Sequence, residues 1–278
     1  MSLPFAKYQG LGNDFILIDN RHQSELALSP EQAVHWCDRH RGIGADGVIF
    51  LLPGTSDTDY QMRMYNGDGS VAEMCGNGIR CLAKFILDLE RKDGQTQYRI
   101  DTLAGLMIPE LQGDGQVKVN MGPPQLLAAE IPTTLAAPDQ KVICQSLEVA
   151  GQVWPVTCVG MGNPHCVTFV EDGVAIPLHD LGPQFEHHPA FPQRTNTEFV
   201  EVVRPDYLKM WVWERGAGAT LACGTGACAT LVAAVLEGRG ATQATVELPG
   251  GCLDIAWDQQ ANTLWMTGPA TFVFRGEI

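Results

Sequence analysis

The sequence has few basic residues for its length. Its 278 residues include 18 Lys and Arg against 32 Asp and Glu, which gives a formal net charge of −14. Nucleic acids and anionic membranes both bind to positively charged protein faces. The charge balance therefore argues against either as the main partner. An anionic small molecule remains compatible with it, because one or two local cations are enough to hold such a ligand.

Long apolar runs and a leader-like segment are also missing. No run reaches the roughly 18 apolar residues of a membrane span, and MSLPFAKYQGLG at the N-terminus lacks the basic region and apolar core of a signal peptide. Hydrophobic residues make up 45% and charged residues 18%, which is typical of a globular protein. We therefore expect a cytoplasmic protein long enough for two domains.

Cysteine, in contrast, is frequent, with nine residues. A reducing compartment would keep most of them as thiols. Five stand in apolar or unremarkable settings, and for these we expect the role of a small buried hydrophobe: Cys37, Cys144, Cys158, Cys166 and Cys252.

Two motifs occur twice. A Cys-Gly-x-Gly turn appears in EMCGNGIRC at 73–81 and in LACGTGACA at 221–229. A Gly-x-Gly-Asn motif opens GLGNDFILI at 10–18 and GMGNPHCVT at 160–168. The stretches that precede the two cysteines also match each other, beginning at residue 64 in one half and at residue 212 in the other. In each stretch the cysteine follows a polar residue, Asn66 or Glu214, by nine positions. Two matches at nearly the same spacing indicate two similar units joined in tandem.

The periodicities predict which elements each unit contains. Apolar spacing predicts a helix after Cys75 that ends near Gly94, and a second helix after Cys223 that ends near Gly238. Most other signals are strands, including FILID, GVIFLL, YQMRMY, QVKVNM, TEFVEVV, LKMWVW, TVEL and ATFVF. We therefore expect an α+β fold of two pseudo-symmetric domains, each a curved mixed sheet wrapped around a central helix. The stretch MGPPQ at 121–125 is the expected join.

A Cys-Gly-x-Gly turn at the start of a helix has definite chemistry. Glycine lets backbone N–H groups approach a ligand closely, and the helix N-terminus favours an anion. The same positive end lowers the pKa of a neighbouring thiol. Two such turns from two similar halves suggest a ligand held in the cleft between them.

This arrangement fits racemisation or epimerisation of an amino acid. The reaction needs a base on one face of the α-carbon and an acid on the other, and a thiolate and a thiol supply both. The helix N-termini would stabilise the carbanion through its carboxylate. The chemistry requires no cofactor, and the sequence shows no signature of one.

Three other readings of the cysteines stay open at this point. They could form a disulfide, bind zinc or simply pack in the core. The spacings of Cys75 with Cys81 and of Cys223 with Cys228 are wrong for a C-x₂-C zinc knuckle. GIGADG at 42–47 matches a dinucleotide-binding pattern, but it precedes a strand instead of opening a helix, so we discard that interpretation.

Along nearly its whole length the sequence resembles the diaminopimelate epimerase family. The resemblance is carried by GLGNDFILID, RHRGIGADG, YNGDGSVAEMCGNGIRC, GMGNPHCV, RTNTEFVEV, WERGAGATLACGTGACA and WMTGP. It implies a cofactor-independent isomerase of lysine and peptidoglycan precursor biosynthesis, which interconverts LL- and meso-2,6-diaminopimelate. It also implies that the last strand returns to the first domain, which gives domains at 1–121 plus 269–278 and at 122–268.

The resemblance assigns roles to individual residues. Cys75 and Cys223 match the catalytic base and acid. Asn66 and Glu214 match positions near the reacting amino group. The remaining matches are the turn whose backbone N–H groups hold the reacting carboxylate (Gly76, Asn77, Gly224 and Thr225) and the contacts to the distal end of the substrate (Asn13, Asn163, Asn196 and Arg215).

Several points stay secondary or open. His165 follows Asn163 closely and is a candidate to assist one thiol, although a packed or surface histidine is equally consistent. Gly47 replaces a glutamine that some family members carry, so any side-chain contact made there is missing. Alternatives are a proline-type racemase, a non-catalytic binding protein of the same fold, and an isomerase that works without the thiol pair. The resemblance further suggests a homodimer with a small-molecule amino-acid substrate, without metal, nucleic acid or membrane partners.

Overall fold

The computed structural model describes residues 2–23, 25–90 and 95–278. It divides into two compact units, Met1–Asn120 with Thr267–Ile278 and Met121–Met266. Both boundaries fall inside strands, so the chain passes from one unit to the other within β9 and within β18. The elements up to the first crossing are β1 (Pro4–Gly10), β2 (Asn13–Asp19), α1 (Pro30–Cys37), β3 (Gly47–Pro53), β4 (Tyr60–Asn66), β5 (Val71–Ala72), α2 (Gly76–Glu90), β6 (Ile100–Thr102), β7 (Gly105–Met107), β8 (Glu110–Leu111) and β9 (Val117–Gly122).

The remaining elements belong to the second unit, except that β19 completes the first. They are β10 (Gln145–Val149), β11 (Gln152–Gly160), β12 (Pro164–Val170), α3 (Leu178–Glu186), β13 (Asn196–Arg204), β14 (Tyr207–Glu214), β15 (Gly218–Ala219), α4 (Gly224–Leu236), β16 (Gln243–Leu248), β17 (Gly251–Asp258), β18 (Thr263–Gly268) and β19 (Thr271–Glu277).

The two units share one topology. In the first, the strand order is β19-β1-β2-β3-β4-β6-β7, and in the second β10-β11-β12-β13-β14-β16-β17-β18. The parallel pairs β2–β3 and β4–β6 correspond to β12–β13 and β14–β16, and each of the four crossovers contains a helix. The short strands β5 and β15 occupy matching places beside β4 and β14. These mixed sheets and few helices confirm the predicted α+β fold with two pseudo-symmetric domains.

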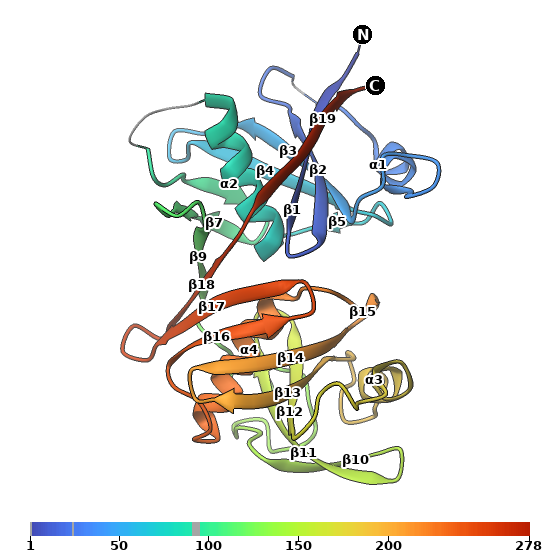
Figure 1. Cartoon of the computed structure of the whole chain (residues 1–278), viewed down its shortest axis with the longest axis vertical. Helices are drawn as coiled ribbons and strands as arrows, with labels where there is room; N and C mark the ends of the chain where they lie inside the picture. Colours follow the sequence, from blue (N-terminus) through green and yellow to red (C-terminus); the bar gives the residue numbers. More distant parts are fainter. Residues whose placement is uncertain (1, 24, 91–94) are drawn as a thin grey trace. The chain divides into compact units, whose positions relative to one another are not determined.

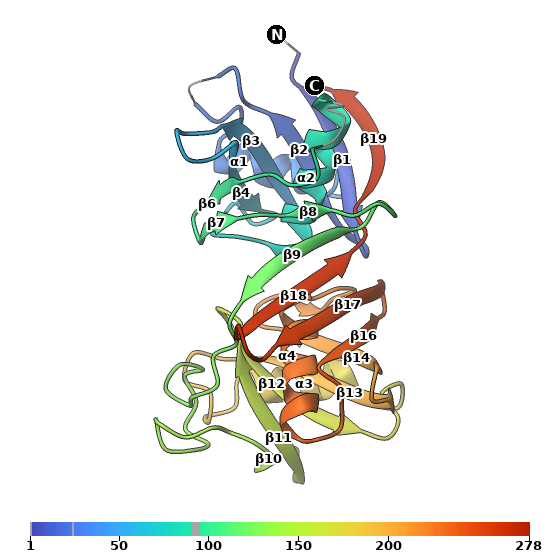
Figure 2. The same cartoon turned by 90° about the vertical axis from the view of Figure 1, so that its left-hand side faces the viewer.

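The predicted central helices are α2 and α4. In the first unit α2 lies against β1 and β2, while α1 packs on β3 and β4 (Figure 1). In the second unit α4 contacts strands from β11 to β17 (Figure 2) and is buried on nearly all sides. Gly238 ends α4 with a φ of +68°, which an L side chain adopts rarely. The other predicted end, Gly94, lies outside the described residues.

All the strands predicted from the sequence are present, but two helices were not predicted. The crossover helices α1 and α3 are short, and α3 contains Pro183, which hides its periodicity. Ser29 caps α1 through a capping box with Gln32. No helix in the described parts of the chain has the length and apolar character of a membrane span.

Two of the five cysteines expected to be buried are exposed. Cys37, Cys158 and Cys166 are buried, as predicted, but Cys144 and Cys252 are not. Cys252 occupies an outward position of β17, where side chains alternate between the core and solvent. Cys144 lies outside the strands with a φ of +50°. Apolar neighbours in the sequence therefore did not place these two thiols in the core.

Three aromatic rings organise the core beneath α3. Trp154, Phe185 and Phe199 lie with ring centroids 5.4 to 5.8 Å apart in edge-on arrangements. They are the centre of a buried cluster formed by β10–β13 and α3. Edge-on aromatic pairs stabilise a core beyond the effect of their buried area.

Because Phe199 is fully buried, Phe199→Ala should lower the free energy of unfolding by about 3–5 kcal/mol in urea denaturation. Val174→Ala is the matched control, since that side chain is 79% exposed and should change stability little. A loss below about 1 kcal/mol at Phe199 would show that this cluster is not tightly packed.

Candidate active site

Both cysteine turns have the same local geometry. Cys75 directly precedes α2 and Cys223 is the N-cap of α4. The sulfur of each accepts a backbone N–H three residues ahead, from Gly78 and Gly226, with N···S distances of 3.4 Å. Each cysteine carbonyl also accepts the first helical hydrogen bond, from Ile79 at 2.8 Å and from Ala227 at 3.0 Å. The thiol thus takes the capping position that Ser, Thr or Asp usually fills.

The second glycine of each turn is needed because of close packing. A β-carbon on Gly78 would lie 2.9 Å from the Ile49 side chain and 3.3 Å from the Cys75 β-carbon. On Gly226 it would lie 3.1 Å from the Cys223 sulfur and 2.8 Å from a carboxylate oxygen of Glu198. The glycines therefore let the helix approach its own capping sulfur.

The Gly-x-Gly-Asn motif contacts the cysteine turn in both units. In the first unit, the Asn77 side-chain amide donates to Asn13 Oδ1 at 3.0 Å, and the Cys75 sulfur lies 3.9 Å from the same oxygen. In the second, Asn163 donates to Thr225 Oγ1 at 3.3 Å, and that hydroxyl is 3.6 Å from the Cys223 sulfur. Each repeated asparagine is thus part of the structure around one thiol.

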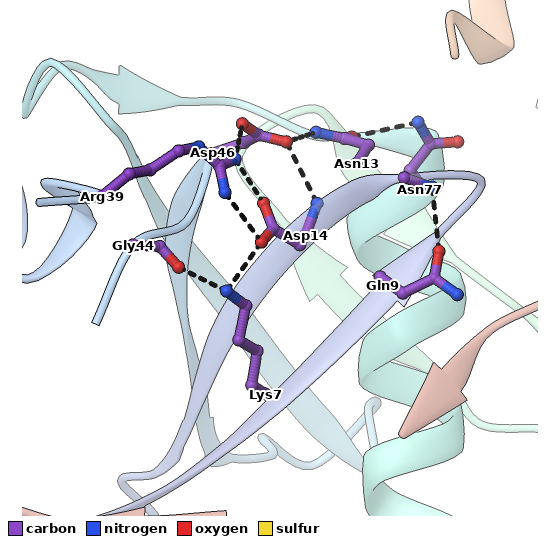
Figure 3. Close-up of polar contacts among 9 residues, drawn as sticks. Lys7, Gln9, Asn13, Asp14, Arg39, Gly44, Asp46 and Asn77 are labelled. Carbon is purple, nitrogen blue, oxygen red and sulfur yellow. Dashed lines mark hydrogen bonds and ion pairs between the residues drawn. The ribbon is translucent and has the colours of Figure 1, made fainter. Parts of the chain in front are cut away.

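A charged network fixes Asn13 from the other side (Figure 3). Asp46 accepts from the Asn13 amide at 2.7 Å and from the backbone N–H of Asp14 at 3.0 Å. Arg39 bonds both carboxylates, and Lys7 lies 2.8 Å from Asp14. Burial alone would raise the pKa of Asp14, but hydrogen bonds from Arg39 and Lys7 outweigh it and hold that pKa below its usual value. Because Asp46 only accepts hydrogen bonds, it turns the Asn13 oxygen toward Asn77 and Cys75.

A buried arginine completes this turn. Arg80 is fully buried and donates to Asn77 Oδ1 at 2.9 Å, to the Gly76 carbonyl at 3.1 Å and to the Pro269 carbonyl at 3.3 Å. The last of these ties the returning chain before β19 to the start of α2.

In the second unit, His165 lies in a fully buried pair with Glu198. Its Nδ1 is 2.6 Å from Glu198 Oε1, and its Nε2 is 2.9 Å from Asn163 Oδ1. Burial raises the pKa of Glu198, although His165 opposes this. His165 is therefore packed inside the protein and reaches Cys223 through Asn163 and Thr225.

The environment of Cys223 favours the neutral thiol. Cys223 is only 4% exposed. Burial, followed by the charges of Glu214 and Glu198, raises the pKa of the Cys223 thiol well above its ordinary value. Hydrogen bonds from Thr225 and the Gly226 N–H act in the opposite direction and are weaker.

The remaining predicted residues lie at the ends of the matching strands β4 and β14 and at the start of β13. Asn66 donates to Ser70 Oγ at 2.9 Å, and Glu214 accepts from Thr220, so each closes its own glycine-rich loop. Asn196 is buried and holds the Arg215 backbone N–H at 2.9 Å while donating to the Pro164 carbonyl at 2.8 Å.

The structure groups the predicted residues by unit. Asn13, Asn66, Cys75, Gly76 and Asn77 belong to the first unit, and Asn163, His165, Asn196, Glu214, Arg215, Cys223, Gly224 and Thr225 belong to the second. Sequence reasoning missed three charged residues that bond the surroundings of the thiols: Asp46 contacts Asn13, Arg80 contacts Asn77, and Glu198 contacts His165. Asp46 lies in the GIGADG stretch, which was considered only as a dinucleotide-binding pattern.

Gly47 cannot be replaced simply. A β-carbon at this position would lie 2.7 Å from the Tyr65 carbonyl oxygen and 3.0 Å from the Met64 side chain. The backbone of this chain is therefore fitted to glycine at this position. Within residues 2–23, 25–90 and 95–278, no group of three or more His, Cys, Asp or Glu side chains is placed to hold a metal ion.

Solved structures share this two-unit fold at low sequence identity. A PhzF-family phenazine biosynthesis protein from Bacillus anthracis superposes with a TM-score of 0.71 at 14% identity, covering 100% of this chain and 99% of that one. A hydroxyproline epimerase from Agrobacterium vitis gives a TM-score of 0.69 at 14% identity, covering 100% and 91%. The architecture is thus the one found in PhzF-type proteins and amino-acid epimerases.

Sequence comparison identifies the family within this class. The diaminopimelate epimerase family profile matches residues 5–127 and 157–273. The chain is 70% identical over 285 residues to a diaminopimelate epimerase of Thermosynechococcus vestitus, covering 100% of both. It is 67% identical over 277 residues to that of Gloeothece citriformis, covering 99% of each. The chain belongs to the diaminopimelate epimerase family, which confirms the resemblance.

The raised pKa of Cys223 predicts slow alkylation by iodoacetamide at neutral pH, since the thiolate is the nucleophile. The rate should rise about tenfold per pH unit below that pKa. Glu214→Gln removes one of the two negative charges, so it should lower the pKa and speed alkylation of Cys223 severalfold at pH 8. Peptide mass spectrometry separates this thiol from the exposed cysteines. Glu201→Gln is the control, and an equal rate in both variants would contradict the electrostatic assignment.

Proposed function

We propose that this chain interconverts LL- and meso-2,6-diaminopimelate by moving the α-proton between two thiols, as a step of lysine and peptidoglycan precursor biosynthesis. The observation that carries the proposal is the repeated capping geometry, in which a cysteine sulfur stands at the N-terminus of α2 and of α4. Family membership at 70% identity over the whole chain supplies the substrate.

The reaction inverts one of the two α-carbons. One sulfur, as thiolate, takes the α-proton, and the electron pair left on carbon is delocalised into the carboxylate. The other sulfur, as thiol, gives its proton to the opposite face and becomes the new thiolate. Each turnover conserves protons and charge but leaves the proton on the other sulfur. The starting form returns when that sulfur gives its proton to solvent and the new thiolate takes one up, or when the reaction runs backwards. All the chemistry of this scheme is supplied by Cys75 and Cys223, with no cofactor.

We infer that the reacting carboxylate binds at the helix starts. The first N–H groups of an α-helix have no partner within the helix, and the helix dipole adds positive potential there. The backbone N–H groups that would hold the carboxylate are those of Gly76, Asn77, Gly224 and Thr225. Donors fixed in advance stabilise the charge that develops in the transition state.

The substrate has to contact residues of both halves at once. We propose that residues of both domains, 1–121 plus 269–278 and 122–268, bind one substrate molecule, so that each thiol faces one side of the same α-carbon. Two-base inversion needs a thiol on each side, because the proton leaves from one face of the α-carbon and a proton arrives at the opposite face.

The charged dipeptide Glu214–Arg215 suits a substrate with an amino acid group at each end. A carboxylate pairs with an ammonium group, and the guanidinium of Arg215 can hold the distal carboxylate with two parallel bonds. Asn66 is proposed beside the reacting amino group, and Asn163 and Asn196 toward the distal end. Asn13 is part of the same proposed set, although its amide already bonds Asp46 and Asn77.

The setting of the enzyme is also a proposal. We propose a cytoplasmic homodimer whose partner is the small-molecule substrate, without nucleic acid or membrane. Large apolar side chains on the edge strand β19 support self-association: Phe272, Val273 and Phe274 are 42, 47 and 41% exposed.

The proposal predicts that both thiols are essential. Cys75→Ser and Cys223→Ser should each lower kcat by about a hundredfold or more, because general acid–base groups contribute on that order. The assay follows LL-diaminopimelate and the meso product by chiral chromatography in reducing buffer. Cys252→Ser, at an exposed thiol, should retain wild-type activity. Wild-type rates in either active-site variant would remove that residue from the mechanism.

A further inference from the structure

Glu186 is a buried carboxylate at the end of α3 that no sequence motif pointed to. Its side chain is 6% exposed. Oε2 accepts from the indole Nε1 of Trp213 at 2.8 Å, and Oε1 accepts from the backbone N–H of Gly216 at 3.0 Å. Both contacts reach more than 25 residues along the chain.

The two donors flank the Glu214–Arg215 dipeptide. Trp213 directly precedes it and Gly216 directly follows it. The backbone N–H of Arg215 is held separately by Asn196. Two successive backbone amides and one neighbouring side chain are thus fixed from outside the strand, which leaves the dipeptide little conformational freedom.

Glu186 lies at a helix position that is unfavourable for a carboxylate. It is the last residue of α3, where the helix dipole disfavours a negative charge. Arg194 offsets part of this unfavourable interaction, because its Nη1 lies 3.6 Å from Oε1. Arg194 itself has a φ of +60°, a backbone conformation that is uncommon for residues other than glycine. A carboxylate that is unfavourable for its own helix is accounted for by the two donors that it accepts from.

The matching place in the first unit has no such carboxylate contact among the described residues. There α1 packs on the loop after β4 through apolar and backbone atoms: a β-carbon on Gly69 would lie 2.9 Å from Val34 and 3.2 Å from the Pro30 carbonyl. That loop carries the uncharged Asn66–Gly67. Among the described residues, a carboxylate from the crossover helix therefore bonds this loop in the second unit, where the dipeptide carries two charged side chains.

We propose that Glu186 is a positioning residue for substrate recognition, which holds the Glu214–Arg215 dipeptide in its binding conformation through Trp213 and Gly216. This inference rests on the proposed function of the site. Glu186 accepts hydrogen bonds from the residues on either side of the dipeptide and contacts neither thiol. Its loss should therefore weaken substrate binding more than proton transfer. The expected signature is a raised KM with a smaller change in kcat.

Glu186→Gln is the sharpest substitution. It keeps the size of the side chain, but an amide presents one acceptor and one donor group to two N–H donors. One donor is left unsatisfied, and KM for LL-diaminopimelate should rise about tenfold. Glu148→Gln, at an exposed position of β10 in the same unit, is the matched control and should leave KM unchanged.

A double-mutant cycle separates positioning from general destabilisation. Trp213→Phe removes the indole donor, so the amide of Glu186→Gln can then accept from Gly216 alone. The effect of Glu186→Gln on KM should therefore fall to about twofold in the Trp213→Phe background, whereas independent effects would multiply. Equal effects in both backgrounds would overturn the proposal.

Hydrogen exchange tests the same contact without activity. The peptide spanning 212–218 should exchange faster in Glu186→Gln than in Glu148→Gln, while peptides of α2 stay unchanged. Wild-type enzyme is assayed in parallel. If it does not interconvert the isomers, the proposed function fails, and the exchange result alone decides on Glu186. If wild type is active and Glu186→Gln matches it in KM and exchange, the positioning role is wrong.

Discussion

The hydrogen bond from a glycine N–H to a cysteine sulfur at a helix start is the constraint on which the rest depends. It occurs twice with the same N···S distance of 3.4 Å, at Gly78 to Cys75 and at Gly226 to Cys223. Glycine stands three residues after each cysteine, and a β-carbon there would lie 2.9 Å from the Ile49 side chain in the first turn and 2.8 Å from that of Glu198 in the second. The hydrogen bond also places a thiol where backbone N–H groups and the helix dipole favour an anion. The Cys-Gly-x-Gly turn is thus both a cap for a buried helix and a position for a reactive group.

The units repeat their topology but differ in the charges around the thiols. Near Cys75 stand Asn13, Asn77 and the guanidinium of Arg80, which are linked to Asp46 through Asn13. Near Cys223 stand two carboxylates, Glu214 and Glu198, which add to the effect of burial in raising the pKa of its thiol. LL-diaminopimelate has two equivalent ends, but when it is bound only one of its α-carbons lies at the thiols, so its two ends need different surroundings. A duplicated scaffold with different charges in each half fits that requirement.

Much of the fold was predictable because its patterns are local. Apolar and polar residues alternate along the strands, and each central helix follows a Cys-Gly-x-Gly turn that occurs twice in the sequence. The missing parts depend on contacts distant in sequence. Helix α3 contains Pro183, and its carboxylate Glu186 gains a partner only when β14 folds against it. Likewise, Cys252 is exposed because of the face of β17 on which it lies. The site residues of the sequence analysis fall into both units, whereas Asp46, Glu198 and Arg80 have no motif that signals a contact with a thiol turn.

The central claim is that two different groups handle the α-proton, and isotope distribution early in the reaction tests it most directly. LL-diaminopimelate is incubated with the enzyme in deuterated water and sampled at low conversion. With two thiols, the proton leaves to one sulfur and a solvent-derived deuteron arrives from the other. The meso product should therefore carry deuterium at its inverted α-carbon, while the remaining LL substrate stays unlabelled. Substrate that gains deuterium as fast as product forms, or product that keeps the original proton, would contradict two-thiol catalysis.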